Sequence, residues 1–381
     1  MSPAEQRPGD APWVGYEAFC TEQWASGRRI ARVVVVSRGF DTVRFLDGTE
    51  ELTARSTAAF RAAQFASPPA VGDVVAVVSD GSTEAIVAIA PRHGVIVRRD
   101  PADRMSAQVV AANVDTVFCV FGLDRELRPR RVERVLVLVL EGGATPVVVL
   151  TKADLGDGEE RVRVARTVVE AVGPGTAVCV VSSRSGLGLD ELARYLGPGD
   201  TTALLGESGA GKSSLVNALV GDEATQVGAV RGRDSRGRHT TTARRLFSVR
   251  SGGALIDTPG LRALGLWDGA EGVDEAFPDI AALAVECRFR DCRHVDEPGC
   301  AVRRATAGAT LASSRLDAYR ALRAEMDTVE AKREAGRRLR GEGRRPPLRR
   351  TRRRAGVDDD EAQADTTRYG DAAFEVNTDE I

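Results

Sequence analysis

The stretch GESGAGKS at residues 206–213 is the feature that most restricts how this chain can fold. It matches the pattern G-x-x-x-x-G-K-[ST], in which glycines let backbone N–H groups surround the phosphates of a nucleotide. An apolar run typical of a buried strand, TALL at 202–205, comes directly before it, and a run with helical spacing, KSSLVNALVG at 212–221, follows. A glycine-rich turn that arose by chance would not be expected to have a buried strand before it and a helix after it. The sequence therefore predicts a phosphate-binding loop in an α/β domain.

Two side chains of this loop have specific expected roles. Lys212 places a positive charge beside the β- and γ-phosphates, and Ser213 supplies an oxygen ligand to Mg²⁺. We expect the loop as a whole to bind the nucleotide through Gly206, Glu207, Ser208, Gly209, Ala210, Gly211, Lys212, Ser213 and Ser214.

The loop belongs to a longer series in which apolar strand runs alternate with helical stretches from about residue 110. A helical stretch, RRVERVLVLVLEGG, occupies residues 130–143. This alternation predicts a doubly wound α/β domain, which we place at residues 101–272. The strand runs lie at 114–123, 145–151, 176–183, 201–206 and 253–259.

The motif TKAD at residues 151–154 addresses the choice of base. It resembles the [NT]KxD element of the GTPase superfamily and follows a strand run. A carboxylate at Asp154 can accept two hydrogen bonds from guanine, from N1–H and from the exocyclic amino group, whereas adenine offers neither donor. The stem of Lys152 would pack over the ring. A backbone amide in the serine-rich loop VVSSRSGLG, around Ser182 and Ser183, could reach guanine O6, although this loop taken alone is also an ordinary loop. The expected base-binding residues are Thr151, Lys152, Ala153, Asp154, Ser182 and Ser183.

A further short motif, D-x-x-G, ends the last apolar strand run. Asp257 would hold Mg²⁺ through a water molecule, and the amide of Gly260 would meet the γ-phosphate. Asp-Thr-Pro-Gly also forms ordinary turns, so the motif gains weight only beside the phosphate-binding loop.

The order of these motifs along the chain is unusual. GTPases commonly run from the phosphate-binding loop through a switch I threonine and D-x-x-G to [NT]KxD and the serine-rich loop. Here the last two motifs come first. All five motifs lie on loops at one edge of the same sheet, so opening the chain elsewhere leaves the site intact. The sequence thus predicts a circularly permuted GTPase domain.

Residues 28–100 have the pattern of a small β-barrel. Short β-branched runs alternate with turn signals, which indicates about five strands. An OB-like barrel is the first interpretation and an SH3-like barrel the second, and the barrel would either contact RNA or brace the next domain. We expect residues 1–27 to be a flexible segment. The strand runs are 32–37, 41–46, 73–78, 84–90 and 94–99.

Three of the six cysteines and one of the three histidines are gathered as Cys287-x4-Cys292-x-His294-x5-Cys300. Three thiolates and one imidazole can close a tetrahedral Zn²⁺ shell with no open position. An iron–sulfur cluster or free thiols are the alternatives. We expect one structural zinc ion in a helical domain at 273–332. That domain contains an amphipathic helix whose apolar stripe, Leu316, Tyr319, Leu322, Met326 and Val329, would pack in the core.

The charge of the chain is strongly segregated, although its net value is only −2. Residues 332–354 hold twelve Lys or Arg and two Glu, and the chain is acidic beyond residue 356. We expect a disordered tail at 333–381, which either binds a polyanion such as RNA or is a solvated segment without a partner. No apolar run approaches the ~18 residues of a membrane span, so we expect a cytoplasmic protein with no membrane partner.

Together these motifs resemble the ribosome small-subunit-dependent GTPase A family, RsgA, also called YjeQ. The resemblance covers roughly residues 28–330 and includes GRHTTT at 237–242, similar to the switch I of that family, and AANVD at 111–115. It implies a monomeric GTPase that binds the small ribosomal subunit and its rRNA late in assembly, is stimulated by the subunit, and leaves after hydrolysis. Where the family more often has Asn, this chain has Thr151, which retains a hydrogen-bonding oxygen but lacks the amide.

The residue after the D-x-x-G motif, Leu261, cannot orient water as the glutamine of Ras-like enzymes does. We expect His239 to do so once the ribosome orders switch I, although it could instead pack or contact RNA. Either Thr240 or Thr241 would reach Mg²⁺ and the γ-phosphate, and the expected catalytic set is His239, Lys212 and Thr241. The sequence leaves two rival functions open: an RNA-binding scaffold with a GTP-controlled switch and little turnover, and a P-loop ATPase or kinase.

Overall fold

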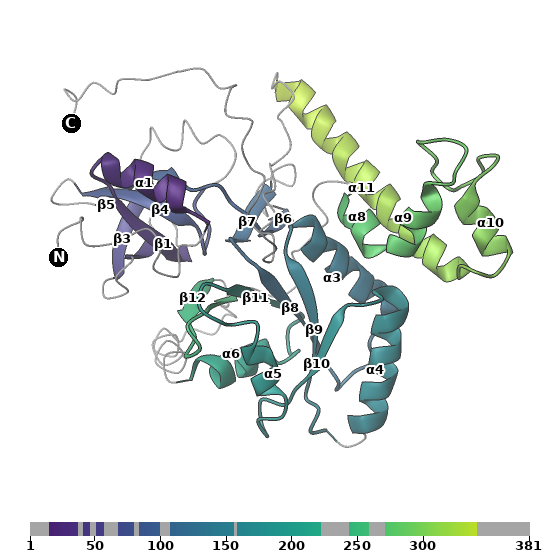
Figure 1. The fold of residues 1–381 in the computed structure, drawn as a ribbon, viewed down its shortest axis with the longest axis horizontal. Helices are drawn as coiled ribbons and strands as arrows, with labels where there is room; N and C mark the ends of the chain where they lie inside the picture. The colour runs from purple at the N-terminus through teal and green to yellow at the C-terminus, as the bar shows by residue number, and fades with distance from the viewer. Residues whose placement is uncertain are drawn as a thin grey trace, which may run out of the picture.

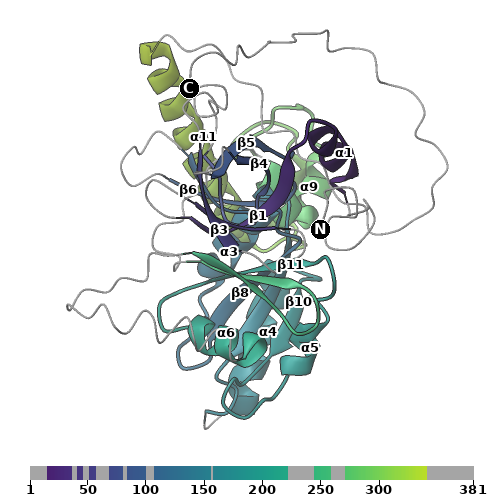
Figure 2. The ribbon, with the colours of Figure 1, turned by 90° about the vertical axis from the view of Figure 1, so that its left-hand side faces the viewer.

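The structure is a computed structural model, and it describes residues 15–36, 41–45, 51–56, 68–79, 84–99, 107–155, 158–221, 244–258 and 271–340. Figure 1 shows three parts: a β-barrel in purple at the left, an α/β domain in teal below the centre, and a helical part in green and yellow at the right. Turned by 90°, the ribbon shows the barrel stacked on one end of the α/β domain (Figure 2).

Five of the described strands close the barrel. They follow one another in the order β1-β2-β3-β5-β4, and a further pairing of β1 with β4 closes the ring. Of these pairings only β3 with β5 is parallel. Inward-facing apolar side chains, among them Val33, Val43 and Ile86, fill the interior. The strands are β1 (Arg29–Val36), β2 (Asp41–Phe45), β3 (Glu51–Ser56), β4 (Val74–Ser79) and β5 (Glu84–Ile89).

The assignment of the run 94–99 to the barrel was wrong. It forms β6 (Val95–Arg99), which pairs with β7 (Ala107–Ala112) in a separate small sheet. Ile96 belongs to the core of the α/β domain, and the amide of Val95 donates to the carbonyl of Gly142 there. The missing barrel strand is β3, whose sequence ELTARS has too few apolar residues to stand out as a strand.

The prediction of a flexible N-terminal segment does not hold for residues 17–25, which form helix α1 (Glu17–Ala25). Cys20 packs on the barrel with Ile30 and Val74. The second buried side chain of the helix is the polar Gln23, whose amide oxygen accepts a hydrogen bond of 2.7 Å from Arg28. This polar residue on the buried face hides the apolar periodicity that a sequence search requires.

The α/β domain confirms the predicted doubly wound architecture. Its strands lie in the order β10-β9-β8-β11-β13-β12, all parallel except β12, which is antiparallel to β13. Successive residues of a central strand alternate between two cores: Val117 and Cys119 pack with helices α3 and α4, whereas Phe118 and Val120 pack with α5 and α6. The elements are β8 (Thr116–Gly122), α3 (Pro129–Glu141), β9 (Thr145–Thr151), α4 (Gly158–Val172), β10 (Ala177–Val180), α5 (Leu189–Ala193), β11 (Thr201–Gly206), α6 (Lys212–Val220), β12 (Arg245–Ser248) and β13 (Ala254–Asp257).

The connection order of this sheet determines where a ligand can bind. From β8 the chain proceeds to β9 and β10 on one side, and β11 and β13 lie on the other side. In open α/β sheets, ligands bind outside the carboxyl ends of the strands where the strand order reverses. That point lies between β8 and β11, and the predicted phosphate-binding loop follows β11.

Barrel and α/β domain share one sheet, because β12 pairs with β1 at Val35 and Arg245, which joins eleven of the described strands. The AANVD motif forms part of this joint. Asn113 donates from its amide to the carbonyl of Gly72 at 3.0 Å and accepts from the amide of His93 at 3.2 Å. Its backbone adopts a left-handed conformation with φ of 58°.

The helical part consists of α8 (Glu271–Ala276), α9 (Pro278–Ala284), α10 (Ala301–Ala307) and α11 (Ser313–Arg340). The expected stripe on α11 is buried at Leu316, Tyr319, Leu322 and Met326. Residues 333–340, predicted as the start of a disordered tail, continue α11, because good helix formers such as Arg, Glu and Ala dominate there. Residues 341–381 lie outside the described residues. No helix in the described part of the chain is long and apolar enough to cross a membrane.

Candidate functional site

The phosphate-binding loop connects β11 to α6, as its sequence context predicted. A Cβ at Gly206 would lie 2.5 Å from the carbonyl oxygen of Val120 on the neighbouring strand β8. Gly211 has a φ of +97° and lies against the side chain of Thr151, with 3.2 Å between its ideal Cβ position and the hydroxyl oxygen. Both positions therefore require glycine, one for space and the other for conformation.

Lys212 folds over the loop that precedes it. Its ammonium donates to the carbonyls of Gly206 at 2.8 Å and Glu207 at 2.7 Å. Burial lowers the pKa of Lys212, and the carboxylate of Asp257 acts in the opposite direction. Asp257 ends β13, directly beside Leu204 of β11, so the predicted Mg²⁺ ligand and the phosphate-binding lysine lie at the same edge of the sheet.

The base-recognition motif contacts the phosphate-binding loop directly. The hydroxyl of Thr151 donates to the carbonyl of Ala210 at 2.5 Å, and the ammonium of Lys152 donates to the carbonyl of Gly209 at 2.7 Å. Lys152 also pairs with Asp124 at 2.8 Å and has a left-handed backbone with φ of 63°. Two motifs that lie far apart in sequence are thus joined into one surface.

Asp154 is held by the serine-rich loop. The hydroxyl of Ser182 donates to Asp154 Oδ1 at 2.7 Å and accepts from the amides of Arg184 and Ser185, each at 3.2 Å. The hydrogen bond from Ser182 lowers the pKa of Asp154, so its exposed carboxylate stays ionised and can only accept. An acceptor with two oxygens is what the N1–H and amino group of guanine require. Ser183 is half-buried beside this pair, as is Ala153 beside Asp154.

A charged group beside the loop was not anticipated from the sequence. The carboxylate of Glu207 pairs with Arg131 at 2.7 Å and with Arg125 at 3.5 Å. Both arginines come from the segment DRELRPRR at 124–131, which contains the connection after β8 and the first turn of α3. The many charged residues directly after a buried strand could have indicated a functional segment. They do not show that Arg125 and Arg131 pair with Glu207.

Part of the expected site lies outside the described residues. This applies to the switch I residues His239, Thr240 and Thr241, and to Gly260 of the D-x-x-G motif. Thr258 of that motif is described, and its buried hydroxyl donates to the carbonyl of Leu204.

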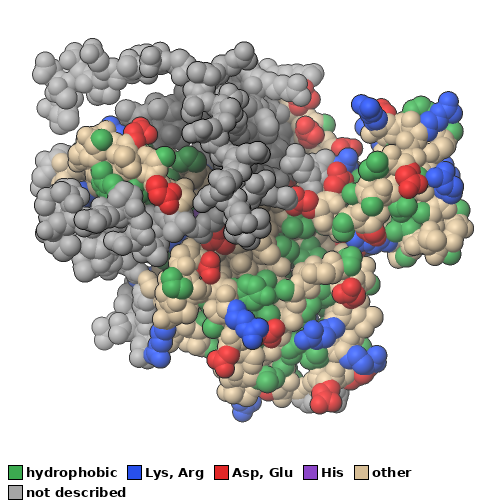
Figure 3. All heavy atoms as spheres, in the orientation of Figure 1, with side chains coloured by type: hydrophobic (Ala, Val, Ile, Leu, Met, Phe, Trp, Pro, Cys, Tyr) green, Lys and Arg blue, Asp and Glu red, His purple; other side chains and the backbone are tan. Residues whose placement is uncertain are grey.

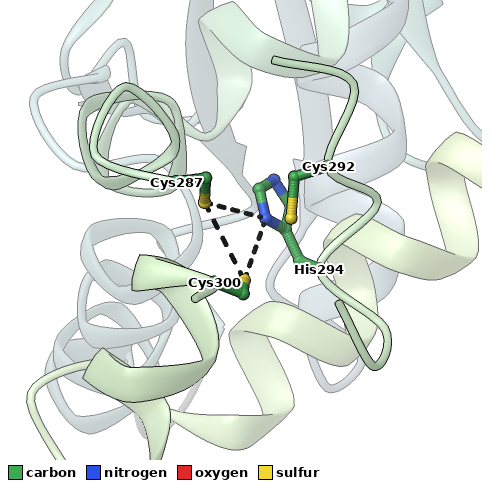
Figure 4. A group of neighbouring side chains, drawn as sticks. All are labelled: Cys287, Cys292, His294 and Cys300. Carbon is green, nitrogen blue, oxygen red and sulfur yellow. Dashed lines mark hydrogen bonds between the residues drawn. The ribbon is translucent and has the colours of Figure 1, made fainter. Parts of the chain in front are cut away.

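The three cysteines and the histidine meet in the loop between α9 and α10, where they could hold a metal ion (Figure 4). Cys300 is the N-cap residue of α10 and accepts from the amide of Arg303 at 3.4 Å. Burial lowers the pKa of His294, which favours the neutral ring that a metal requires.

The spacing of these ligand atoms fits a tetrahedral ion. His294 Nδ1 lies 3.6 Å from the sulfur of Cys287 and 3.4 Å from that of Cys300, and the two sulfurs are 3.9 Å apart. Bonds of about 2.3 Å to sulfur and about 2.0 Å to nitrogen, at tetrahedral angles, separate such ligand atoms by roughly 3.5–3.8 Å. The ligand atoms of all four residues lie within 4.8 Å of one another.

The loop that carries the four candidate metal ligands is held against helix α11. The ring of His294 lies 5.8 Å from the ring of Tyr319, centroid to centroid, and the carbonyl of His294 accepts a hydrogen bond from Arg320. Tyr319 in turn donates to Asp274 on α8 at 3.1 Å. A metal bound here would therefore fix the loop against both α8 and α11.

A family model and two similar curated proteins agree on one family. The model of a family described as RsgA GTPase matches residues 89–267. A protein of Streptomyces avermitilis, named small ribosomal subunit biogenesis GTPase RsgA, is 49% identical over 274 residues, which cover 72% of this chain and 73% of that protein. A protein of the same name from Xylella fastidiosa is 50% identical over 242 residues, 63% of this chain and 72% of that protein.

Two solved structures are similar. YjeQ from Thermotoga maritima has a TM-score of 0.57 and 28% identity, and the match covers 77% of this chain and 96% of that one. YloQ, described as a circularly permuted GTPase, has a TM-score of 0.55 over 80% of this chain and 96% of that one, and its 24% identity shows the fold alone. The permuted order predicted from the motifs is thereby confirmed, and the chain belongs to the RsgA GTPase family of GTP hydrolases.

Proposed function

We propose that this protein hydrolyses GTP in the maturation of the small ribosomal subunit, which it binds together with its rRNA. The observation that carries the proposal is the contact of Thr151 and Lys152 with Ala210 and Gly209, which combines base recognition and phosphate binding in one site. Relatives named for small ribosomal subunit biogenesis support the biological setting, which would be the cytoplasm.

In this proposal Asp154 reads guanine, the loop at 206–214 and Gly260 surround the phosphates, and Lys212 neutralises their charge. Magnesium would be held by Ser213, Asp257, and Thr240 or Thr241. His239 would orient the attacking water once the subunit orders switch I, because Leu261 offers no hydrogen-bonding group at the position after D-x-x-G.

We further propose that Cys287, Cys292, His294 and Cys300 hold one structural Zn²⁺ ion. Zinc bound by four protein ligands has no open position, so it would stabilise the loop and supply no catalysis.

Two surfaces support contact with rRNA. The closure order of the barrel strands, which span residues 29–89, and their parallel β3–β5 pairing support an OB-type barrel, a fold that often binds oligonucleotides. Basic side chains gather on the helical part at the right of Figure 3. We place the end of the GTPase domain at residue 272 and its beginning before β6, whose Ile96 packs in its core, and we expect a monomer. Exposed arginines around the metal ligands are Arg288, Arg290, Arg293, Arg303 and Arg304.

The test is GTP hydrolysis by the purified protein alone, with mature small subunits, and with precursor subunits. We expect subunits to raise kcat roughly tenfold or more, because the chain lacks its own water-orienting glutamine. His239→Ala should lose this stimulation and retain its affinity for GTP.

Equal turnover with and without subunits would contradict the proposal and favour a scaffold with little catalysis. Full stimulation of His239→Ala would contradict the role of that histidine alone.

A further inference from the structure

Helix α3 contacts the phosphate-binding loop at its first turn. Arg131 donates to the carboxylate of Glu207 at 2.7 Å. The backbone carbonyl of Glu207 accepts from the ammonium of Lys212, also at 2.7 Å. The position of Arg131 is therefore connected through one loop residue to the lysine expected to bind the phosphates.

The same helix contacts α11 three residues further along, which is just under one helical turn. Arg134 donates from both terminal nitrogens to the two carboxylate oxygens of Glu325, at 2.8 and 2.7 Å. Paired hydrogen bonds of this kind fix the relative orientation of the two side chains as well as their distance.

A second, buried contact joins the two helices. Glu133 is 5% exposed and Arg315 of α11 is 7% exposed, and their charged groups lie 3.8 Å apart. Arg315 also donates to the carbonyl of Val172 at 2.7 Å and to Asp279 of α9 at 3.0 and 3.1 Å. Arg315 would keep its contacts with Asp279 and Val172 if α3 separated from α11, but the buried carboxylate of Glu133 would lose its ion pair with Arg315.

Helix α11 also reaches the metal-ligand group, since Arg320 donates to the carbonyl of His294. A continuous series of side-chain contacts thus runs from the cysteine and histidine loop through α11 and α3 to the phosphate-binding loop. An intact helix moves as a rigid element over such a short distance, so displacement of α11 would be transmitted to Arg131.

We propose that Arg131 is a positioning residue for the phosphate-binding loop, and that the Arg134–Glu325 pair makes its position depend on the seating of α11. This inference rests on the proposed GTPase function. Contacts made by the helical part would change nucleotide binding through α11, α3 and Arg131. The Arg131–Glu207 pair is partly exposed and adds little to folding stability. Its effect is therefore expected on nucleotide affinity and KM.

The first experiment measures the affinity of fluorescent GDP and GTP for Arg131→Ala, Arg131→Lys, Glu207→Gln, and the double variant Arg131→Ala with Glu207→Gln. We expect Arg131→Ala to weaken binding by about three- to tenfold and to raise KM more than it lowers kcat. Arg131→Lys should recover part of the loss, and Glu207→Gln should add little further to Arg131→Ala, because only the longer pair of Glu207 with Arg125, at 3.5 Å, is left to lose. Additive losses, or unchanged affinity of Arg131→Ala, would overturn the role of Arg131.

The second experiment tests the remote pair with Arg134→Ala, Glu325→Ala, and the exchanged pair Arg134→Glu with Glu325→Arg. We expect each single change to weaken GDP binding by about threefold and the exchange to restore it. Arg163→Ala is the matched control, because it breaks a comparable paired contact, with Glu160 at 2.6 and 2.8 Å, on the surface of α4.

If the α3–α11 variants bind nucleotide as the Arg163→Ala control does, the coupling is wrong. Circular dichroism melting of each variant distinguishes a local effect from unfolding, and a loss of affinity that follows loss of fold would also contradict the proposal. These affinities need no ribosomal subunits, so failure of subunit stimulation would overturn the proposed function and leave this inference standing.

Discussion

At the scale of single residues, Thr151 shows that membership of a sequence motif does not reveal which groups a side chain contacts. In sequence it is a threonine at the first position of [NT]KxD. In the structure its buried hydroxyl donates to the carbonyls of Ala210 and Phe121, which fixes the end of β9 against both the phosphate-binding loop and β8. The side chain is short enough to fit against Gly211, where 3.2 Å separates its oxygen from an ideal Cβ position. Threonine thus suits a site at which the two loops approach closely.

Asp154 carries the choice of base, and Asp154→Asn tests it. The variant should lose GTP affinity by about a hundredfold or more, because an acceptor for two guanine donors is replaced by a group with a single acceptor oxygen. It should gain affinity for XTP, whose C2 carbonyl can accept from the new amide. Competition of GTP, XTP and ATP against fluorescent GDP measures both effects.

Asp190→Asn, at an exposed position on α5, provides the control and should leave all three affinities unchanged. Displacement of labelled nucleotide by ATP as effective as that by GTP in the wild type would refute guanine recognition by Asp154.

At the scale of elements, the strands of the barrel show the limit of pattern analysis. The apolar run VIV in β6 has a stronger strand signal than ELTARS in β3, yet only β3 lies in the barrel. In the barrel a strand needs apolar residues on one face only, and Leu52 and Ala54 suffice. Pairing partners decide which sheet a strand joins, and a single strand does not encode its partners.

The metal-ligand loop gives a prediction at the same scale. Removal of metal by a strong chelator should lower the melting temperature of the helical part by roughly 10 °C or more, because binding of a structural zinc ion also stabilises the fold. Elemental analysis of the untreated protein should give one zinc per chain. Calorimetry before and after chelation measures the change.

Return of the original melting temperature on addition of Zn²⁺, but not of Mg²⁺, controls for damage by the chelator. A chain that contains no zinc as purified, or that melts identically after chelation, would contradict the assignment of these four ligands.

At the scale of the whole molecule, side-chain hydrogen bonds and a strand pairing join the barrel to the α/β domain. Asn113 bonds to Gly72 and His93, Arg32 donates to the hydroxyl of Thr201 at 2.7 Å, and β1 pairs with β12. Because β12 precedes β13 and its Asp257, the orientation of the barrel is connected to the nucleotide edge of the sheet.

Asn113→Gly should loosen this joint. Glycine accepts the left-handed backbone of this position but removes both side-chain hydrogen bonds, so the barrel should move more freely. We expect a larger radius of gyration in small-angle X-ray scattering and faster proteolysis between barrel and α/β domain.

Ala309→Gly is the matched control. It also places glycine at a left-handed position, φ of 56°, but in the loop after α10 and without loss of a side-chain hydrogen bond. Scattering and proteolysis of Asn113→Gly equal to those of Ala309→Gly would show that Asn113 does not hold the joint.

Features that depend on neighbours along the chain can be predicted from the amino-acid sequence. The strand–loop–helix context of residues 201–221, the permuted motif order and the spacing of Cys287 to Cys300 are of this kind, because local backbone geometry and ligand spacing impose them. Tertiary structure alone decided the partners of charged side chains and strands. Arg131 meets Glu207, Arg134 meets Glu325, and Arg315 meets Glu133 across long stretches of chain. A charge attracts any opposite charge, so only the packing of the helices and the closure of the sheets select one partner from many.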